Sequence, residues 1–165
     1  MKKLVIISGR SGSGKTVALR SLEDHGYYSV DNLPLSLLPH LLANQAISNT
    51  EIAVSIDARN TPDHLAEFDK VYAAIDREQC ELKIIFLDAN DTTLLKRFSE
   101  TRRKHPLTHD GLSLTEAIAK EKHLLESLAA KADLIIDTSN LRQYQFRDLI
   151  TERILESNTR ELSLV

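Results

Sequence analysis

Short apolar runs alternate along the chain with longer stretches in which apolar residues recur every three or four positions. The short runs predict five β-strands, and several are continuously apolar, as expected for strands buried on both faces of a parallel sheet. These strands are Leu4–Ser8, Tyr27–Val30, Ile52–Ile56, Leu82–Leu87 and Leu134–Ile136. Strands that alternate with helices indicate a doubly wound α/β fold.

The longer stretches have helical periodicity. They predict helices at about Lys15–Asp24, Leu35–Asn44, Pro62–Glu78, Thr92–Lys104, Ser113–Lys131 and Leu141–Ser157. Asp91 or Thr92 is expected to cap the fourth helix, and Ser113 followed by Glu116 predicts a capping box at the fifth. Right-handed crossovers would place helices on both faces of a five-stranded, mostly parallel sheet, which gives three α/β/α layers.

A glycine-rich segment joins the first predicted strand to the first predicted helix. Gly9-Arg10-Ser11-Gly12-Ser13-Gly14-Lys15-Thr16 matches G-x-x-x-x-G-K-[ST] at every fixed position and has the strand-then-helix context that the motif requires. Glycines let successive backbone N–H groups point at phosphate oxygens, and the helix N-terminus adds partial positive charge. Lys15 is expected to reach the β- and γ-phosphates, with Thr16 as a Mg²⁺ ligand. The segment therefore predicts a nucleoside triphosphate site.

Four aspartates follow predicted strands: Asp31, Asp57, Asp88 and Asp137. In open parallel sheets the ligand crevice lies outside these carboxyl ends. Asp57 is the preferred second metal ligand and a candidate catalytic residue, in a Walker B-like position. It opens Asp57-Ala58-Arg59-Asn60, whose arginine and amide could meet phosphate or base, although a helix-capping turn is the alternative. Asp88 ranks second as the metal carboxylate, and Asp31 ranks third.

Two further segments each allow two interpretations, one functional and one structural. Arg102 and Arg103 lie in a basic run before Pro106, and they could form a lid whose charge stabilises a transferring phosphoryl group. The alternative is a solvated basic helix end, which the helix dipole favours. Asp137-Thr138-Ser139 could flank the base of the nucleotide, or cap the last helix.

The composition limits the remaining classes of function. The chain has 165 residues, a length that suits one domain, and a formal net charge of −3 argues against a surface that grips nucleic acid throughout. Cys80 is the single cysteine, which is compatible with a reducing cytosol. No apolar run approaches the roughly 20 residues of a membrane span. We therefore expect a cytoplasmic protein with no membrane partner, and oligomeric state stays open.

Several segments together resemble the RapZ (YvcJ) family of P-loop nucleotide-binding proteins. They are Ser8–Thr16, Val30–Pro34, Ser55–Asn60, Phe86–Ala89, Thr101–Leu107, Ile136–Ser139 and Arg160–Leu162. The resemblance implies the fold of a small P-loop kinase, with ATP and GTP bound and hydrolysed. Gly9–Thr16 would be the ATP site, and Asp57–Asn60 would correspond to the family's GTP-binding motif.

The resemblance also implies partners beyond the nucleotide. Some family members are RNase adapters that present a small regulatory RNA to an endoribonuclease and so tune amino-sugar synthesis. RNA binding is usually attributed to a second domain, so we expect residues 1–160 to form the nucleotide domain and 161–165 to begin a linker. Three functions compete: a regulatory module with slow hydrolysis, a small-molecule kinase, and a direct RNA-binding domain. The resemblance favours the first.

Overall fold

The computed structural model describes residues 2–44, 51–58, 67–101 and 104–156. Its strands are β1 (Lys2–Gly9), β2 (Tyr28–Val30), β3 (Ile52–Ser55), β4 (Cys80–Asp88) and β5 (Leu134–Asp137). Its α-helices are α1 (Lys15–Asp24), α2 (Leu38–Ala43), α4 (Phe68–Ala74), α5 (Asp91–Glu100), α6 (Leu114–Leu124), α7 (Glu126–Ala130) and α8 (Gln143–Ile150). Shorter turns are η1 (Leu35–Leu37), η3 (Pro106–Asp110) and the π-helical η4 (Thr151–Glu156).

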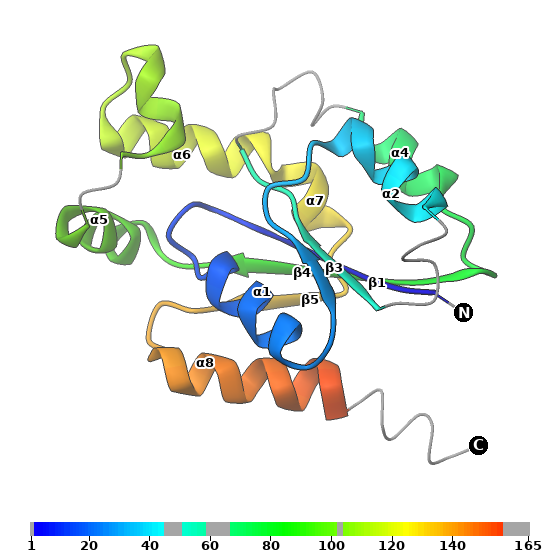
Figure 1. Ribbon diagram of the computed structural model, residues 1–165. Helices are drawn as coiled ribbons and strands as arrows, with labels where there is room; N and C mark the ends of the chain where they lie inside the picture. The colour runs from blue at the N-terminus through cyan, green and yellow to red at the C-terminus, as the bar shows by residue number, and fades with distance from the viewer. Residues whose placement is uncertain (1, 45–50, 59–66, 102–103, 157–165) are drawn as a thin grey trace.

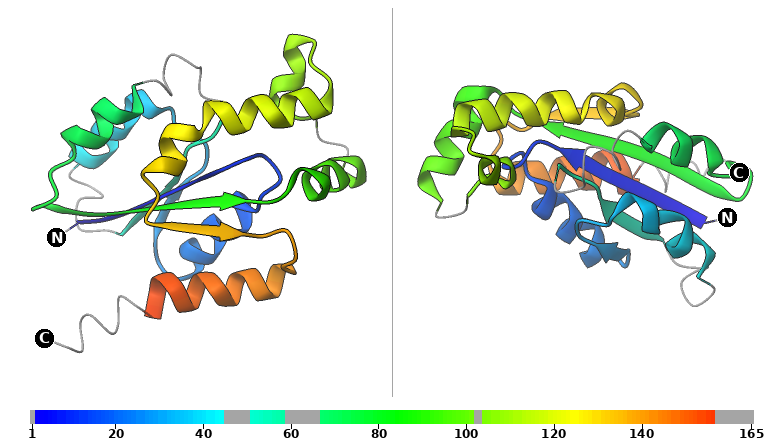
Figure 2. Two further views of the ribbon diagram at one scale, coloured as in Figure 1. Left: turned by 180° about the vertical axis from the view of Figure 1, so that it is seen from behind. Right: turned by 90° about the horizontal axis from the view of Figure 1, so that it is seen from above.

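The five strands form one sheet in the order β2-β3-β1-β4-β5, and every pairing is parallel. The predicted α/β class and the three layers are confirmed. In Figures 1 and 2, α1 and α8 lie on one side of the sheet, and α2, α4 and α7 lie on the other. The central strand β1 pairs with β3 on one side and β4 on the other, so the loop that follows it leaves from the middle of the sheet.

Alternate residues of β1 enter two separate apolar cores, because successive side chains of a strand point to opposite faces. Leu4 and Ile6 pack with η1, α2, α4 and α7, whereas Val5 and Ile7 pack with α1 and α8. A third, small cluster joins α5 to α6 through Leu94 and Ile118. The small cluster joins the two helices that follow the carboxyl end of β4, where the predicted ligand site lies.

Several predicted boundaries differ from the structure for local reasons. The helix expected over Leu35–Asn44 begins as η1 and becomes α2 at Leu38. The helix expected over Ser113–Lys131 divides at Leu125, a fully buried residue, and the bend lets α7 pack on the sheet. Between the fourth and fifth predicted helices, Pro106–Asp110 form the short helix η3.

Of the two predicted helix caps, one is confirmed and the other is wrong. Ser113 caps α6, since its side chain accepts the Glu116 N–H, and its hydroxyl also donates to the Glu116 carboxylate. Asp91 and Thr92 do not cap α5; Asn90 does, because its side-chain oxygen accepts the Thr93 N–H at 2.8 Å. Part of the helix expected over Pro62–Glu78 lies outside the described residues, and α4 occupies the rest.

Candidate functional site

The phosphate loop is the turn between β1 and α1, residues 9–16. Gly9 has φ of 149°, and a Cβ placed there would lie 2.2 Å from the Leu87 carbonyl oxygen of β4. Gly14 caps α1 with φ of 111°, in the left-handed region, and a Cβ there would press on the Phe146 ring at 3.2 Å. Position 9 requires glycine because two strands approach closely there, and position 14 requires it because of its left-handed backbone conformation.

Arg10 fastens the loop to the end of β4. Its Nε donates to Asp88 Oδ1 at 2.9 Å, its Nη1 to Asp91 Oδ1 at 2.6 Å, and its Nη2 to the Ala89 carbonyl. Burial alone would lower the pKa of Arg10, but the hydrogen bonds to Asp91 and Asp88 hold it above its ordinary value. The side chain of Arg10 therefore braces the loop, and the contact of this residue with a nucleotide stays a prediction.

Arg97 of α5 and Thr138 brace the other side of the loop. Arg97 Nη1 donates to the Gly12 carbonyl at 2.7 Å, and its Nη2 donates to the Thr138 carbonyl at 2.6 Å. Thr138 is buried, and its hydroxyl donates to the Ser13 carbonyl at 2.7 Å. Burial lowers the pKa of Arg97 below its ordinary value, and the charge of Asp137 opposes this effect. These contacts fix the positions of the Gly12 and Ser13 carbonyls, so α5 and the segment after β5 both hold the loop.

Asp137-Thr138-Ser139 thus has a role that the sequence did not suggest. Asp137 accepts both the Ser139 N–H, at 2.9 Å, and the Ser139 hydroxyl, at 2.6 Å. These two hydrogen bonds lower the pKa of Asp137. The N-cap of α8 is Arg142, so this segment does not cap the helix.

A buried acid and a buried histidine complete the surroundings of the loop. Glu121 of α6 accepts the N–H and the hydroxyl of Ser11, both at 2.7 Å, and lies 3.1 Å from His105 Nε2. Both Glu121 and His105 are almost entirely inaccessible to solvent. Sequence reasoning missed this pair, although a glutamate on the apolar side of a helix, beside Ala117 and Ile118, was a signal available in the pattern.

Lys15 and Thr16 stand in the first turn of α1, as predicted. Lys15 Nζ donates to the Gly9 carbonyl at 2.9 Å and the Arg10 carbonyl at 3.2 Å, so its ammonium lies over the loop. Thr16 is exposed. The Ser13 hydroxyl is buried, and within the described residues it has no hydrogen-bond partner. The loop therefore offers a cation, an exposed hydroxyl and an unsatisfied buried hydroxyl at a helix N-terminus, a combination that suits an anion.

The strand-end aspartates separate into different environments. Asp57 follows β3, the neighbour of β1, and is 2% exposed. Asp31, after β2, accepts the Ser55 hydroxyl at 2.7 Å, and that hydroxyl in turn accepts the Asn32 N–H. Asp88 is engaged by Arg10. A hydroxyl from Thr16 and a carboxylate from Asp57 are oxygen donors of the kind that Mg²⁺ prefers, so this donor set fits that ion.

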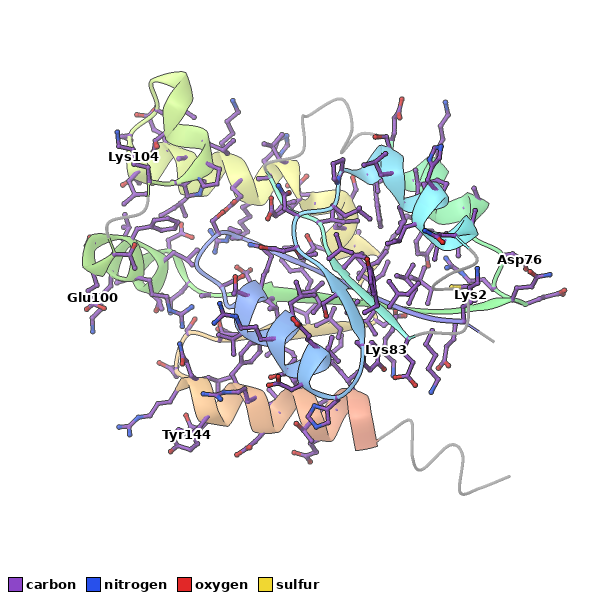
Figure 3. All side chains as sticks on the ribbon, viewed as in Figure 1. Lys2, Asp76, Lys83, Glu100, Lys104 and Tyr144 are labelled. Carbon is purple, nitrogen blue, oxygen red and sulfur yellow. The ribbon has the colours of Figure 1, made fainter. Side chains whose placement is uncertain are left out.

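Four predicted site residues, Arg59, Asn60, Arg102 and Arg103, lie outside the described residues. Their described neighbours can be placed. Ala58 is buried. Figure 3 shows Glu100 and Lys104, which stand before and after Arg102 and Arg103 in the sequence, at the end of the molecule formed by α5 and α6. Lys2 and Asp76 lie at the opposite end.

Comparison with solved structures shows the same fold in small kinases. Shikimate kinase from Bacteroides thetaiotaomicron aligns with a TM-score of 0.58 and 14% identity, covering 94% of this chain and 98% of that one. A sugar kinase from Janibacter aligns with a TM-score of 0.59 and 16% identity, covering 94% of each chain. Thymidylate kinase from Candida albicans gives 0.55 and 14%, covering 94% of this chain and 92% of that one. At these identities the likeness establishes the P-loop kinase fold alone.

No helix within the described ranges is both long and apolar enough to cross a membrane. Among curated proteins, a nucleotide-binding protein from Hahella chejuensis is 53% identical over 99% of this chain, and one from Pseudomonas putida is 53% identical over 93%. The chain spans 58% and 55% of the lengths of these two relatives. The model of the RapZ-like N-terminal domain matches residues 2–158, which confirms the resemblance seen in the sequence. The chain therefore belongs to the RapZ-like N-terminal domain family.

Proposed function

We propose that this domain binds ATP or GTP with Mg²⁺ on residues 9–16, hydrolyses it slowly, and acts as a regulatory nucleotide sensor. The observation that carries the proposal is the bracing of the phosphate loop. Arg10 ties the loop to Asp88 at the end of β4, and Arg97 of α5, Glu121 of α6 and Thr138 after β5 bond to loop atoms. The contacts of the protein itself therefore hold the loop in place. A preorganised turn of N–H groups binds phosphate without first losing conformational entropy.

Each residue of the site then has a distinct task. The N–H groups of the loop and of the first turn of α1 hold the phosphates, and Lys15 exchanges its carbonyl partners for phosphate oxygens. Thr16 and Asp57 hold Mg²⁺, which neutralises charge that develops on the phosphates. The sequence alone assigns Arg102 and Arg103 to a lid over the phosphates. It likewise assigns Arg59 and Asn60 to binding of the nucleotide.

We further propose that the domain serves within an RNase adapter. Both curated relatives carry the name nucleotide-binding protein and extend well beyond the matched region. By family resemblance, the longer protein binds a small regulatory RNA and presents it to an endoribonuclease in the cytoplasm, mainly through a second domain. The net charge of −3 is compatible with RNA recognition outside this domain.

A small-molecule kinase is the second candidate. Asp31, directly after β2, accepts the hydroxyl of Ser55, the last residue of β3, and Asp57 follows two residues later. A carboxylate there could hold the hydroxyl of a phosphate acceptor. The aligned kinases share this fold, but their low identity transfers no substrate.

Titration of labelled ATP and GTP with Mg²⁺ tests nucleotide binding, with Lys15→Ala as the comparison. We expect saturable binding to the wild-type domain and a loss of at least 100-fold in Lys15→Ala, because the lysine is the main side-chain cation of the loop. Equal affinity in the two proteins would refute the assignment. Lys70→Ala, an exposed lysine on α4, is the matched control and should bind normally.

Two further measurements separate the remaining functions. A screen of small metabolites for phosphoryl acceptance supports the kinase if one acceptor raises turnover far above that with water. Binding of this chain to structured RNA, measured as salt is varied, tests direct RNA recognition. Tight, steeply salt-dependent binding would contradict the placement of RNA recognition outside this domain.

A further inference from the structure

The Glu121 carboxylate joins two segments that are distant in sequence. Its Oε1 accepts the Ser11 N–H at 2.7 Å and faces His105 Nε2 at 3.1 Å, and its Oε2 accepts the Ser11 hydroxyl at 2.7 Å. Ser11 belongs to the phosphate loop, and His105 precedes η3. Both oxygens of one buried carboxylate are thereby used to hold the loop against the connection between α5 and α6.

The second partner of His105 fixes the tautomer of its neutral ring. The Leu107 N–H donates to His105 Nδ1 at 3.1 Å, so Nδ1 must be the acceptor nitrogen. In a neutral imidazole the proton then lies on Nε2, which donates to Glu121. The Phe98 ring packs against the imidazole, with ring centroids 5.2 Å apart. The histidine is therefore fixed by α5, η3 and α6 at once.

This arrangement satisfies a carboxylate that solvent does not reach. A buried charge is costly unless it is paired and hydrogen-bonded. Glu121 has three donors: the N–H and the hydroxyl of Ser11, and Nε2 of His105. Displacement of either the loop or the η3 segment would remove at least one of these donors. The position of one segment therefore constrains the position of the other.

We propose that Glu121 is a positioning residue of the nucleotide site: it holds the first turn of the phosphate loop and couples it to His105 and the η3 segment. The inference rests on the proposed function for its effect on nucleotide affinity, but not for the coupling itself. The coupling can be measured without any ligand.

The first experiment measures amide hydrogen exchange in the ligand-free domain. In Glu121→Ala we expect faster exchange, by about tenfold or more, both in residues 9–16 and in residues 104–111. Glu121→Gln should stay close to wild type, because its amide oxygen can accept the two N–H groups while its NH₂ donates to the Ser11 hydroxyl. Glu126→Gln removes the same charge from an exposed position on the neighbouring helix and is the control.

The second experiment is an ATP titration of the same proteins. Glu121→Ala should bind about tenfold more weakly, and Glu121→Gln should match wild type or bind more tightly, since it keeps the geometry and loses a negative charge near the phosphates. If wild type does not bind nucleotide, the proposed function fails, and the exchange experiment still decides the coupling.

The proposal is overturned if folded Glu121→Ala leaves exchange in both segments unchanged, or if Glu121→Gln loosens them as much as Ala does. If Glu121→Ala does not fold, Ser11→Ala decides. That change removes one hydrogen bond at a partly exposed loop position, and it should still speed exchange in residues 104–111 as well as in 9–16. Unchanged exchange in residues 104–111 would refute the coupling.

Discussion

Arg10 and Asp88 form an ion pair in which Arg10 Nε lies 2.9 Å from Asp88 Oδ1, and the Arg10 side chain is 2% exposed. The pair joins the second residue of the phosphate loop to the last residue of β4. Because Asp88 also accepts the Ala89 N–H, the carboxylate sets the direction in which the chain leaves the sheet. The ion pair therefore shapes both the phosphate loop and the entry to α5.

Arg10→Ala should lower the free energy of unfolding by about 2 kcal/mol, measured by urea denaturation. The expected cost is below the ~3–5 kcal/mol for breaking a fully buried ion pair, since Asp91 is 64% exposed and can be hydrated. Asp91→Asn is the control and should cost less than about 1 kcal/mol. An equal loss of stability in both variants would show that the ion pair with Asp88 contributes no more than the one with Asp91.

Gly9→Ala should destabilise the fold by about 3 kcal/mol or more and abolish ATP binding, because the added Cβ would meet backbone rather than a flexible side chain. Thermal unfolding and ATP titration measure the two effects. Gly26→Ala is the matched control: its φ is also positive, at 93°, but nothing lies within 4 Å of its Cβ. It should cost about 1 kcal/mol and leave ATP affinity intact.

Arg97→Ala should weaken ATP binding by about tenfold and lower stability by about 1 kcal/mol, because the Gly12 and Thr138 carbonyls lose their donor. Isothermal titration and urea unfolding provide the two values. Lys96→Ala removes an exposed cation one residue away and should change neither. If both variants lose affinity equally, general charge attraction and not bracing of the loop explains the effect.

Asp57→Asn should raise the Mg²⁺ concentration needed for half-maximal ATP hydrolysis by at least tenfold, since an amide binds the ion more weakly than a carboxylate does. Asp88→Asn should leave that concentration near wild type and reduce stability instead, because Asp88 is occupied by Arg10. The reverse pattern would make Asp88 the metal ligand.

The lowered pKa of Asp137 predicts a pH-dependent contribution to stability. A carboxyl group with a depressed folded pKa stabilises the fold above its unfolded pKa, near 4, and loses this contribution as pH falls through the folded value. Asp137→Ala should therefore be less stable than wild type at pH 7, by under about 1 kcal/mol because the group is exposed. The gap should narrow as pH falls below about 4. Asp137→Asn keeps an acceptor for Ser139 and should lose less. A gap that does not change with pH would rule out the ionised carboxylate as its source.

Local pattern predicted most of the fold. All five strands are present, and α1 has the predicted bounds, because apolar runs and the glycine motif are local signals. The N-cap residue of α5 was harder to predict, because Asn90 and Asp91 are adjacent and both residue types suit an N-cap. The division of the fifth helix depends on the burial of Leu125 against the sheet, which helical periodicity alone does not reveal.

The phosphate loop was predicted from the sequence, but its supports were not. Glu121 reaches Ser11 across 110 residues, and Arg97 reaches Gly12 across 85. The apolar neighbours of Glu121 in the sequence indicate that it is buried, but they do not show which segment it contacts. The partners depend on how the helices are stacked at the end of the sheet. The same reason explains why Arg10 was expected at the nucleotide while its side chain points to β4.

The central place of β1 has a consequence for the lifetime of the protein in a cell. This strand is paired on both edges and buried on both faces, so it should be among the last parts of the chain to open. A ligand held by the loop that directly follows β1 stabilises the whole domain, by about 2.7 kcal/mol at 100 times its dissociation constant. Nucleotide supply would then set how rarely the domain unfolds, and with it the rate at which proteases remove the protein.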